Sequence, residues 1–288
     1  MKTIIAKDAG YCFGVRDAVN VAYDAAKKFG KVYMLGDIVH NENVVSDLSK
    51  AGAVVVDKIS QVPDNGTLLF RAHGTKKNIW QEAKARKINI IDATCPLVHD
   101  IHHEVKTLAA EGRRIIIIGD HGHDEVIAIA DQVKDTIVIS NPEEANQLRK
   151  MKKIGIVTQS TQMLSNVKNI VSILMSKTIN VDLRFINTIC FPTRRNHEQI
   201  ETLSEECDLI IIIGSFTSAN SKRLTELARK KNKNAYQVTN ESELNEQWFK
   251  GVDTVGVSAG ASTPDYIIKE VKSKIDKIGR NINGKRQN

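Results

Sequence analysis

Three of the four cysteines in this sequence stand in the same local setting, and thiolates are strong metal ligands. Cys12, Cys95 and Cys190 each follow a short apolar run that is typical of a buried strand, and each precedes a helical pattern. Pro96, directly after Cys95, suits the first position of such a helix. Three strand ends that point at one centre would gather the three thiolates. The sequence therefore predicts a site with three thiolate ligands.

Two kinds of metal site fit three thiolates. Zinc would need a histidine as fourth ligand, and structural zinc sites usually contain closely spaced cysteine pairs, which this sequence lacks. A four-iron cluster normally takes four cysteines, so three would leave one iron open to a substrate. Cysteines that are buried and bind nothing are a third interpretation, which three matching positions make less attractive. Cys207 lies between acidic residues before another apolar run, and we expect it to be structural.

Polar side chains that could bind an anion also stand at the ends of expected strands or before expected helices. They are His40, His73, His123, Ser218, Asn220 and Ser262. Helix N-termini add unpaired N–H groups and a partial positive charge. Loop hydrogen bonds and helix capping would explain any one of these residues, but together they predict a phosphate or diphosphate site. The sequence has no glycine-rich nucleotide motif, so a nucleotide is not indicated.

Glu125 is the acid in the best position to deliver a proton. It follows the expected strand 115–118 through a short turn rich in glycine and histidine, and it stands two residues after His123. We therefore expect it to face the same centre as the cysteines. A first-turn glutamate that offsets the helix dipole is the alternative interpretation.

The elements that would position these residues alternate between strands and helices. Apolar runs such as 115–118, 154–157 and 209–213 are separated by helical patterns, which predicts an α/β protein with mainly parallel sheets. In open α/β sheets ligands bind beyond the carboxyl ends of the strands, where most of the unusual polar residues stand. Three segments of similar length predict a threefold pseudo-repeat. The expected units are 13-95, 96-189, and 190-280 with the N-terminal strand 1-12, followed by a basic tail, 281-288.

Composition excludes several classes of protein. With 41% hydrophobic and 26% charged residues, the chain of 288 residues resembles ordinary soluble proteins. Four cysteines make no disulfide framework, and no apolar run is long enough for a signal peptide or a membrane span. We therefore expect a cytoplasmic protein without a membrane partner.

The net charge of +7 is concentrated at the C-terminus, where Lys269 onward holds seven basic residues against two acids. A solvated helix face is the simplest interpretation of this segment. Docking of an acidic protein is an alternative, and we expect no nucleic acid partner.

Eight short segments match one known family, in order and over nearly the whole chain. They are Ala9–Val15, Ile38–Asn41, Ala72–Gly74, Asp92–Pro96, Gly122–Val126, Thr158–Thr161, Asn187–Cys190 and Ala259–Asp265. On these segments the sequence resembles the 4-hydroxy-3-methylbut-2-enyl diphosphate reductase family. The resemblance implies an α/β enzyme of three units around one central [4Fe-4S] cluster, with Cys12, Cys95 and Cys190 as its three cysteine ligands.

The resemblance also implies a reaction and its residues. Family members reductively dehydroxylate (E)-4-hydroxy-3-methylbut-2-enyl diphosphate to isopentenyl and dimethylallyl diphosphate, the last step of the methylerythritol phosphate route to isoprenoids. The implied catalytic residues are Glu125, His123, Ser160 and Thr158. The implied substrate-binding residues are His40, His73, His123, Ser160, Ser218, Ala219, Asn220 and Ser262. Ferredoxin or flavodoxin would supply electrons to a monomeric enzyme.

The sequence departs from the family pattern at a few positions. Ser160 replaces a more usual threonine but keeps the hydroxyl, and Ala219 replaces a frequent serine. None of the departures removes a cysteine or the acid. Two alternatives stay open, a related iron–sulfur reductive dehydratase with another allylic substrate and a non-enzymatic iron–sulfur or zinc sensor.

Overall fold

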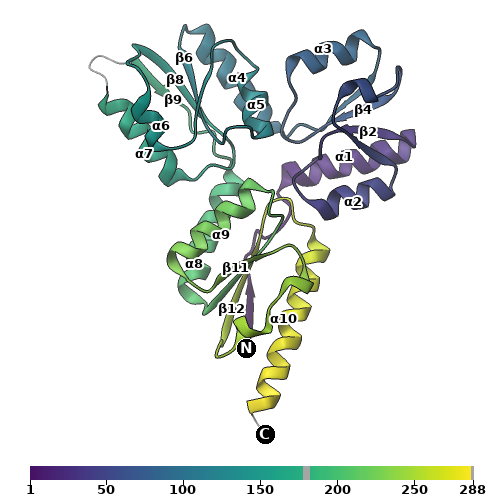
Figure 1. Ribbon diagram of the computed structural model, residues 1–288, viewed down its shortest axis with the longest axis vertical. Helices are drawn as coiled ribbons and strands as arrows, with labels where there is room; N and C mark the ends of the chain where they lie inside the picture. The colour runs from purple at the N-terminus through teal and green to yellow at the C-terminus, as the bar shows by residue number, and fades with distance from the viewer. Residues whose placement is uncertain (178–181, 287–288) are drawn as a thin grey trace. The chain divides into compact units, whose positions relative to one another are not determined.

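The computed structural model describes residues 1–177 and 182–286, and its strands form three four-stranded sheets (Figure 1). The strands are β1 (Lys2–Ile5), β2 (Val32–Leu35), β3 (Ala53–Val56), β4 (Thr67–Phe70), β5 (Asn89–Asp92), β6 (Arg114–Ile118), β7 (Ile137–Ile139), β8 (Lys153–Thr158), β9 (Asp182–Phe185), β10 (Leu209–Ile213), β11 (Ala235–Val238) and β12 (Thr254–Ala259). The α-helices are α1 (Phe13–Phe29), α2 (Glu42–Lys50), α3 (Lys77–Ala85), α4 (Pro96–Ala110), α5 (Asp124–Ala130), α6 (Pro142–Gln147), α7 (Leu164–Ser176), α8 (Phe191–Glu206), α9 (Ala219–Lys231) and α10 (Asp265–Arg286).

The three sheets share one strand order. Sheet A runs β1-β12-β10-β11, sheet B runs β3-β2-β4-β5, and sheet C runs β7-β6-β8-β9, and every pairing is parallel. If β1 is counted after β12, each sheet has its strands in the order second, first, third, fourth. This common order confirms the predicted α/β class with a threefold pseudo-repeat.

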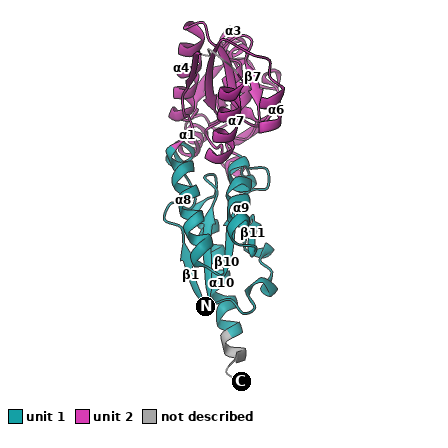
Figure 2. Ribbon diagram, turned by 90° about the vertical axis from the view of Figure 1, so that its left-hand side faces the viewer, with its two compact units in different colours: residues 1–16, 40–45, 191–288 teal, residues 17–39, 46–190 magenta. Residues whose placement is uncertain are grey.

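The chain divides into two compact units (Figure 2). Unit 1 contains residues 1–16, 40–45 and 191–288 and holds sheet A. Unit 2 contains residues 17–39 and 46–190 and holds sheets B and C. The boundaries expected from the sequence stay a prediction, and the last two residues of the basic tail, 287–288, lie outside the described residues.

The core of unit 1 is formed around β10, an apolar strand that is buried along its whole length. Because successive side chains of a strand point to opposite faces, Leu209, Ile211 and Ile213 share one face of sheet A. These three pack in one cluster with Val271 and Ile275 of α10. Helices α8 and α9 cover the opposite face (Figure 1).

Sheet C in unit 2 is covered on both faces in the same way. Ile115 and Ile117 of β6 pack with residues of α4 and α5. Ile116 and Ile118, which point the other way, pack with residues of α6 and α7. Helices on both faces explain why β6 is apolar from Ile115 to Ile118.

In each sheet a glycine directly follows the first strand. Gly36, Gly119 and Gly214 follow β2, β6 and β10, and the N–H of each donates to the last carbonyl of the neighbouring second strand at 2.9 Å. At Gly119 a Cβ atom would lie 2.6 Å from Val126 in α5. The glycine therefore lets α5 approach the end of β6 closely.

His102 is a buried histidine on α4, with 7% of its surface exposed. Its Nε2 atom has no hydrogen-bond partner among the described residues. Burial lowers the pKa of His102 from its ordinary 6.5 to about 4, with smaller contributions from His99 and Lys106. The imidazole is therefore neutral in the folded protein near pH 7.

We expect His102 to make the protein less stable in mild acid. Between pH 6.5 and 4 the unfolded chain binds a proton at this histidine that the folded chain does not. The contribution of His102 to the free energy of unfolding therefore falls as pH falls through this window and is constant outside it. From pH 7.5 to 5 the loss is about 2 kcal/mol. The melting temperature of His102→Leu should fall less than that of the parent over this range, and equal falls in both proteins would contradict the prediction.

Among the described residues, no helix combines the length and the apolar character needed to cross a membrane.

Candidate active site

The three predicted cysteine ligands occupy equivalent positions in the three sheets. Each cysteine follows the fourth strand of its sheet and donates its N–H to the carbonyl that lies two residues beyond the end of the third strand. The bonds run from Cys12 to Ala261 (3.3 Å), from Cys95 to Ala72 (3.0 Å) and from Cys190 to Ser160 (2.9 Å). The same backbone contact therefore fixes each cysteine beside the carboxyl end of its sheet.

The fourth cysteine differs in surroundings and in chemistry. Cys207 is buried, whereas Cys12, Cys95 and Cys190 are half-buried. Burial raises the pKa of the Cys207 thiol, and the neighbouring carboxylates Glu206 and Asp208 raise it further. A thiol that resists ionisation is a poor metal ligand. The chemistry of the other three, which are accessible thiols at equivalent strand ends, fits an iron–sulfur cluster.

Glu125 is held in one orientation by Ser160. Its carboxylate is buried, with 3% of the residue exposed, and it accepts hydrogen bonds from the Ser160 N–H at 2.6 Å and the Ser160 Oγ at 2.7 Å. His123 caps α5, because its Nδ1 atom accepts a hydrogen bond from the Glu125 N–H at 3.2 Å. Bonds to a carboxylate are short and strong. This arrangement suits an acid that passes a proton through the neighbouring serine hydroxyl.

Thr158, at the end of β8, is fully buried and contacts Thr188, a residue to which the sequence pattern assigns no role. The Thr188 Oγ1 atom accepts from the Thr158 N–H at 2.8 Å and donates to the Thr158 carbonyl at 2.6 Å. Together with the bond from Cys190 to Ser160, this contact ties the loop before Cys190 to the end of β8. The only sequence signal for Thr188 was its place in the segment Asn187–Cys190.

Two of the predicted anion-binding histidines lie together in unit 2. His73 follows β4 of sheet B and His123 precedes α5 beside sheet C. Their ring centroids are 5.6 Å apart, and the rings meet edge to face. The structure therefore brings donors from two sheets into one group, although the two residues are far apart in sequence.

Unit 1 holds the other predicted anion-binding residues. Ser218 is the N-cap of α9 and its Oγ accepts from the Ser221 N–H at 3.3 Å, and Ala219 is the first residue of the helix. The Ser262 Oγ donates to the His40 carbonyl at 3.1 Å, which joins two predicted residues that are distant in sequence.

Asn220 is the most informative residue of this group. It is buried, with 6% exposed, and neither its amide nitrogen nor its amide oxygen has a partner among the described residues. A buried polar group without a partner costs about 1–3 kcal/mol, so proteins rarely keep one without a reason. The amide, beside the N-terminus of the 13-residue helix α9, is suited to donate to an anionic ligand such as a diphosphate.

Comparison with known proteins points to one family. Residues 3–276 match the family model described as LytB protein. The 4-hydroxy-3-methylbut-2-enyl diphosphate reductase of Geotalea uraniireducens is 39% identical over 284 residues, which cover 98% of this chain and 100% of that protein. The enzyme of the same name from Geobacter metallireducens is 39% identical over 279 residues, which cover 96% of this chain and 98% of that protein.

Two solved structures are also similar over most of their length. The E-1-hydroxy-2-methyl-but-2-enyl-4-diphosphate reductase from Plasmodium falciparum superimposes with a TM-score of 0.89 at 30% identity, over 96% of this chain and 87% of that one. A second structure, of (E)-4-hydroxy-3-methyl-but-2-enyl diphosphate reductase, described as the terminal enzyme of the non-mevalonate pathway, has a TM-score of 0.72 at 35% identity. It is matched over 96% of this chain and 100% of its own.

Proposed function

Because the chain belongs to the LytB protein family, we propose that it is a 4-hydroxy-3-methylbut-2-enyl diphosphate reductase. The observation that carries the proposal is the equivalent placement of Cys12, Cys95 and Cys190 at three sheet ends. The reaction takes up two electrons and two protons, and the hydroxyl of (E)-4-hydroxy-3-methylbut-2-enyl diphosphate leaves as water. The products are isopentenyl and dimethylallyl diphosphate, with which the methylerythritol phosphate pathway ends.

The cofactor of the proposed enzyme is one iron–sulfur cluster of the [4Fe-4S] type. Cys12, Cys95 and Cys190 would hold it, and Cys207, a buried thiol of raised pKa, would not. When bound, the cluster supplies electrons to the substrate and offers one iron without a protein thiolate.

The chain itself would supply the diphosphate site and the proton path. The diphosphate ligands are His40, His73, His123, Ser218, Ala219, Asn220 and Ser262. Glu125 is the proton donor, since a hydroxyl leaves far more readily as water than as hydroxide. Ser160 bonds both carboxylate oxygens of Glu125, and Thr158 would orient the substrate hydroxyl beside it.

The proposed electron donor is ferredoxin or flavodoxin, and the proposed setting is a monomer in the cytoplasm without a nucleic acid partner. The electron donor must come from outside the chain, because each turnover consumes two electrons.

The decisive test is turnover of the hydroxylated diphosphate by anaerobically purified protein. With dithionite and methyl viologen as reductants, we expect oxidation of the dye together with formation of both isomeric diphosphates. A brown, iron-containing protein that leaves this substrate unchanged would contradict the proposal and favour a related dehydratase or an iron–sulfur sensor. A colourless protein with bound zinc would favour a zinc sensor and contradict the proposal.

We expect Asn220→Ala to weaken binding of the substrate about ten- to a hundredfold, the effect of losing one hydrogen bond to a charged group. The melting temperature should not fall, because the lost amide has no partner among the described residues. Asn240→Ala removes a helix-capping amide elsewhere in unit 1 and serves as control, with unchanged affinity. Calorimetric titration would measure the substrate affinity of both variants. An affinity of Asn220→Ala equal to that of the parent would mean that Asn220 does not bind the diphosphate.

A further inference from the structure

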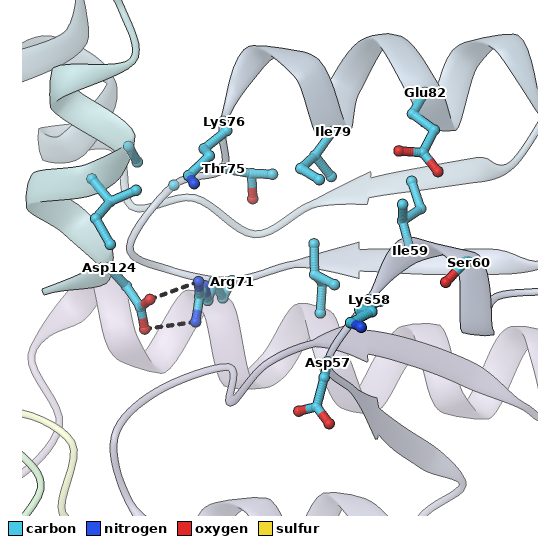
Figure 3. A pocket seen from close by; sticks show the side chains of 14 residues that line it. Asp57, Lys58, Ile59, Ser60, Arg71, Thr75, Lys76, Ile79, Glu82 and Asp124 are labelled. Atoms are coloured by element: carbon cyan, nitrogen blue, oxygen red, sulfur yellow. Dashed lines mark hydrogen bonds and ion pairs between the residues drawn. The ribbon is translucent and has the colours of Figure 1, made fainter. Parts of the chain in front are cut away.

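Helix α5 carries Glu125 in its first turn, and an ion pair of Asp124, the residue before Glu125, holds the same turn. Arg71 forms two hydrogen bonds to Asp124, from Nη1 to Oδ2 at 2.6 Å and from Nη2 to Oδ1 at 2.8 Å (Figure 3). The two side chains are 24% and 26% exposed, which makes this pair more sheltered than a surface salt bridge. Sheltered, bidentate arginine–carboxylate pairs fix geometry better than exposed pairs do.

The ion pair connects two sheets within unit 2. Arg71 is the first residue after β4 of sheet B, and Asp124 is the first residue of α5, which packs on sheet C. The equivalent residue after the third strand of sheet C is Gln159, whose Oε1 atom accepts from the Asp120 N–H at 2.9 Å and so stays within its own sheet. Arg71 and Gln159 thus occupy equivalent positions, but only Arg71 forms a contact between the two sheets.

Gly36 leaves room for the guanidinium of Arg71. It follows β2 with a φ of +75°, and a Cβ atom at this position would lie 2.6 Å from the Arg71 Nη1 atom. A side chain here would be strained by the backbone and would collide with the guanidinium. The end of β2 is thus shaped to let Arg71 reach Asp124.

A cavity of about 440 Å³ borders the ion pair, lined by Ile59, Ile79 and Ile127 among others. Figure 3 shows Arg71 and Asp124 at one end of it. Because open space rather than packed side chains lies on this side of α5, close packing does not fix the helix there. The C-terminal end of α5 is tied in a similar way, since the Asp131 Oδ2 atom accepts from the Lys77 N–H at 2.6 Å.

We propose that Arg71 and Asp124 form a positioning pair that sets the orientation of the first turn of α5, and through it the placement of Glu125. Successive residues of a helix point about 100° apart, so fixing Asp124 toward Arg71 aims Glu125 toward Ser160. The effect on turnover rests on the proposed function, whereas the effect on α5 does not. Displacement of a reacting group by about 1 Å can lower a rate a hundredfold.

The kinetic test compares Arg71→Lys, Arg71→Met and Asp124→Asn with the parent. We expect turnover to fall about ten- to a hundredfold in each variant while the substrate dissociation constant changes less than about threefold. Lysine keeps the charge but lacks the planar fork that makes two parallel bonds. Arg71→Lys should therefore be impaired almost as much as Arg71→Met, a result that simple loss of charge would not give.

Hydrogen exchange of the cluster-containing protein tests the same pair without reference to activity. In Asp124→Asn the amides of residues 119–131 should exchange about tenfold faster than in the parent, while those of 209–213 in unit 1 keep the parent rate. Asp64→Asn breaks the Arg86–Asp64 ion pair of the same unit and is the matched control, with parent turnover and parent exchange.

Parent-like turnover or parent-like exchange in the Arg71 and Asp124 variants would overturn the proposal. Faster exchange in 119–131 in a protein whose parent form does not reduce the diphosphate would instead contradict the proposed function and leave the positioning pair in place. If Arg71→Met does not fold, the double variant Arg71→Met/Asp124→Leu removes both charges together. Turnover at the parent level in a folded double variant would also overturn the proposal.

Discussion

Serine in place of Cys12, Cys95 or Cys190 should remove iron from the purified protein and abolish turnover, the largest effect that we expect from any single substitution. A serine hydroxyl is a far weaker ligand for iron than a thiolate. A cluster held by only three cysteines should therefore be lost when one of them is replaced. Iron and sulfide per chain, measured after anaerobic purification, report the loss directly and do not depend on which substrate the enzyme uses.

Cys207→Ser is the matched control for the ligand variants. Cys207 is buried at 6% exposure and its thiol has a raised pKa, so we expect this variant to keep its iron and its turnover. Full iron in any of the three ligand variants would contradict the assignment. Loss of the cluster from Cys207→Ser, in a variant that keeps its fold, would contradict it as well.

Local patterns predicted the elements of the fold well. The apolar run 115–118 predicted a strand, and β6 spans Arg114–Ile118. The run that ends before Cys95 predicted another, and β5 spans Asn89–Asp92. The prediction of β6 succeeds because a strand that is covered by helices on both faces is apolar where it is buried, and Ile115 to Ile118 are all buried. In β5 only the two central residues are apolar and partly buried, and they were enough to indicate the strand. The turn residues that follow then identify the carboxyl end, where ligands bind.

Contacts between residues far apart in sequence could not be predicted in this way. Nothing in the segment Arg71–Gly74 indicates that Arg71 pairs with Asp124, because the two residues are 53 positions apart and belong to elements of different sheets. Thr188 is a similar case, since its hydroxyl gains a role only when the strand register places it beside Thr158. The pattern of residue types does not encode these registers.

His102 shows a signal that was present in the sequence and easily missed. It lies four residues after Val98 and three before Val105, so helical spacing puts it on the apolar face of α4. A histidine beside two others on one helix looks like part of a polar surface, and the spacing is the better guide. The unit boundary has no such signal, because residues 40–45 join unit 1 through contacts with distant parts of the chain.

Glu125→Gln is expected to lower turnover by about 10²–10⁴-fold while the protein keeps its iron and binds its substrate, the usual share of general acid catalysis. The contacts of Glu125 explain why glutamine is the right substitution. Its amide oxygen can accept from the Ser160 N–H and its amide nitrogen can donate to the Ser160 Oγ, so both contacts of the carboxylate have a replacement. The variant therefore keeps the shape of the site and loses only a transferable proton.

Three measurements on one preparation separate the role of Glu125 from a structural one. Iron content should equal that of the parent, because no cysteine is changed, and substrate titration should give an affinity near the parent value. The steady-state rate with dithionite and methyl viologen should fall by the expected factor. Glu143→Gln, which changes an exposed first-turn acid of α6 in the same unit, should leave all three unchanged. Near-normal turnover of Glu125→Gln with full iron would exclude Glu125 as the proton donor, and His123 or a bound water would then have to deliver the proton.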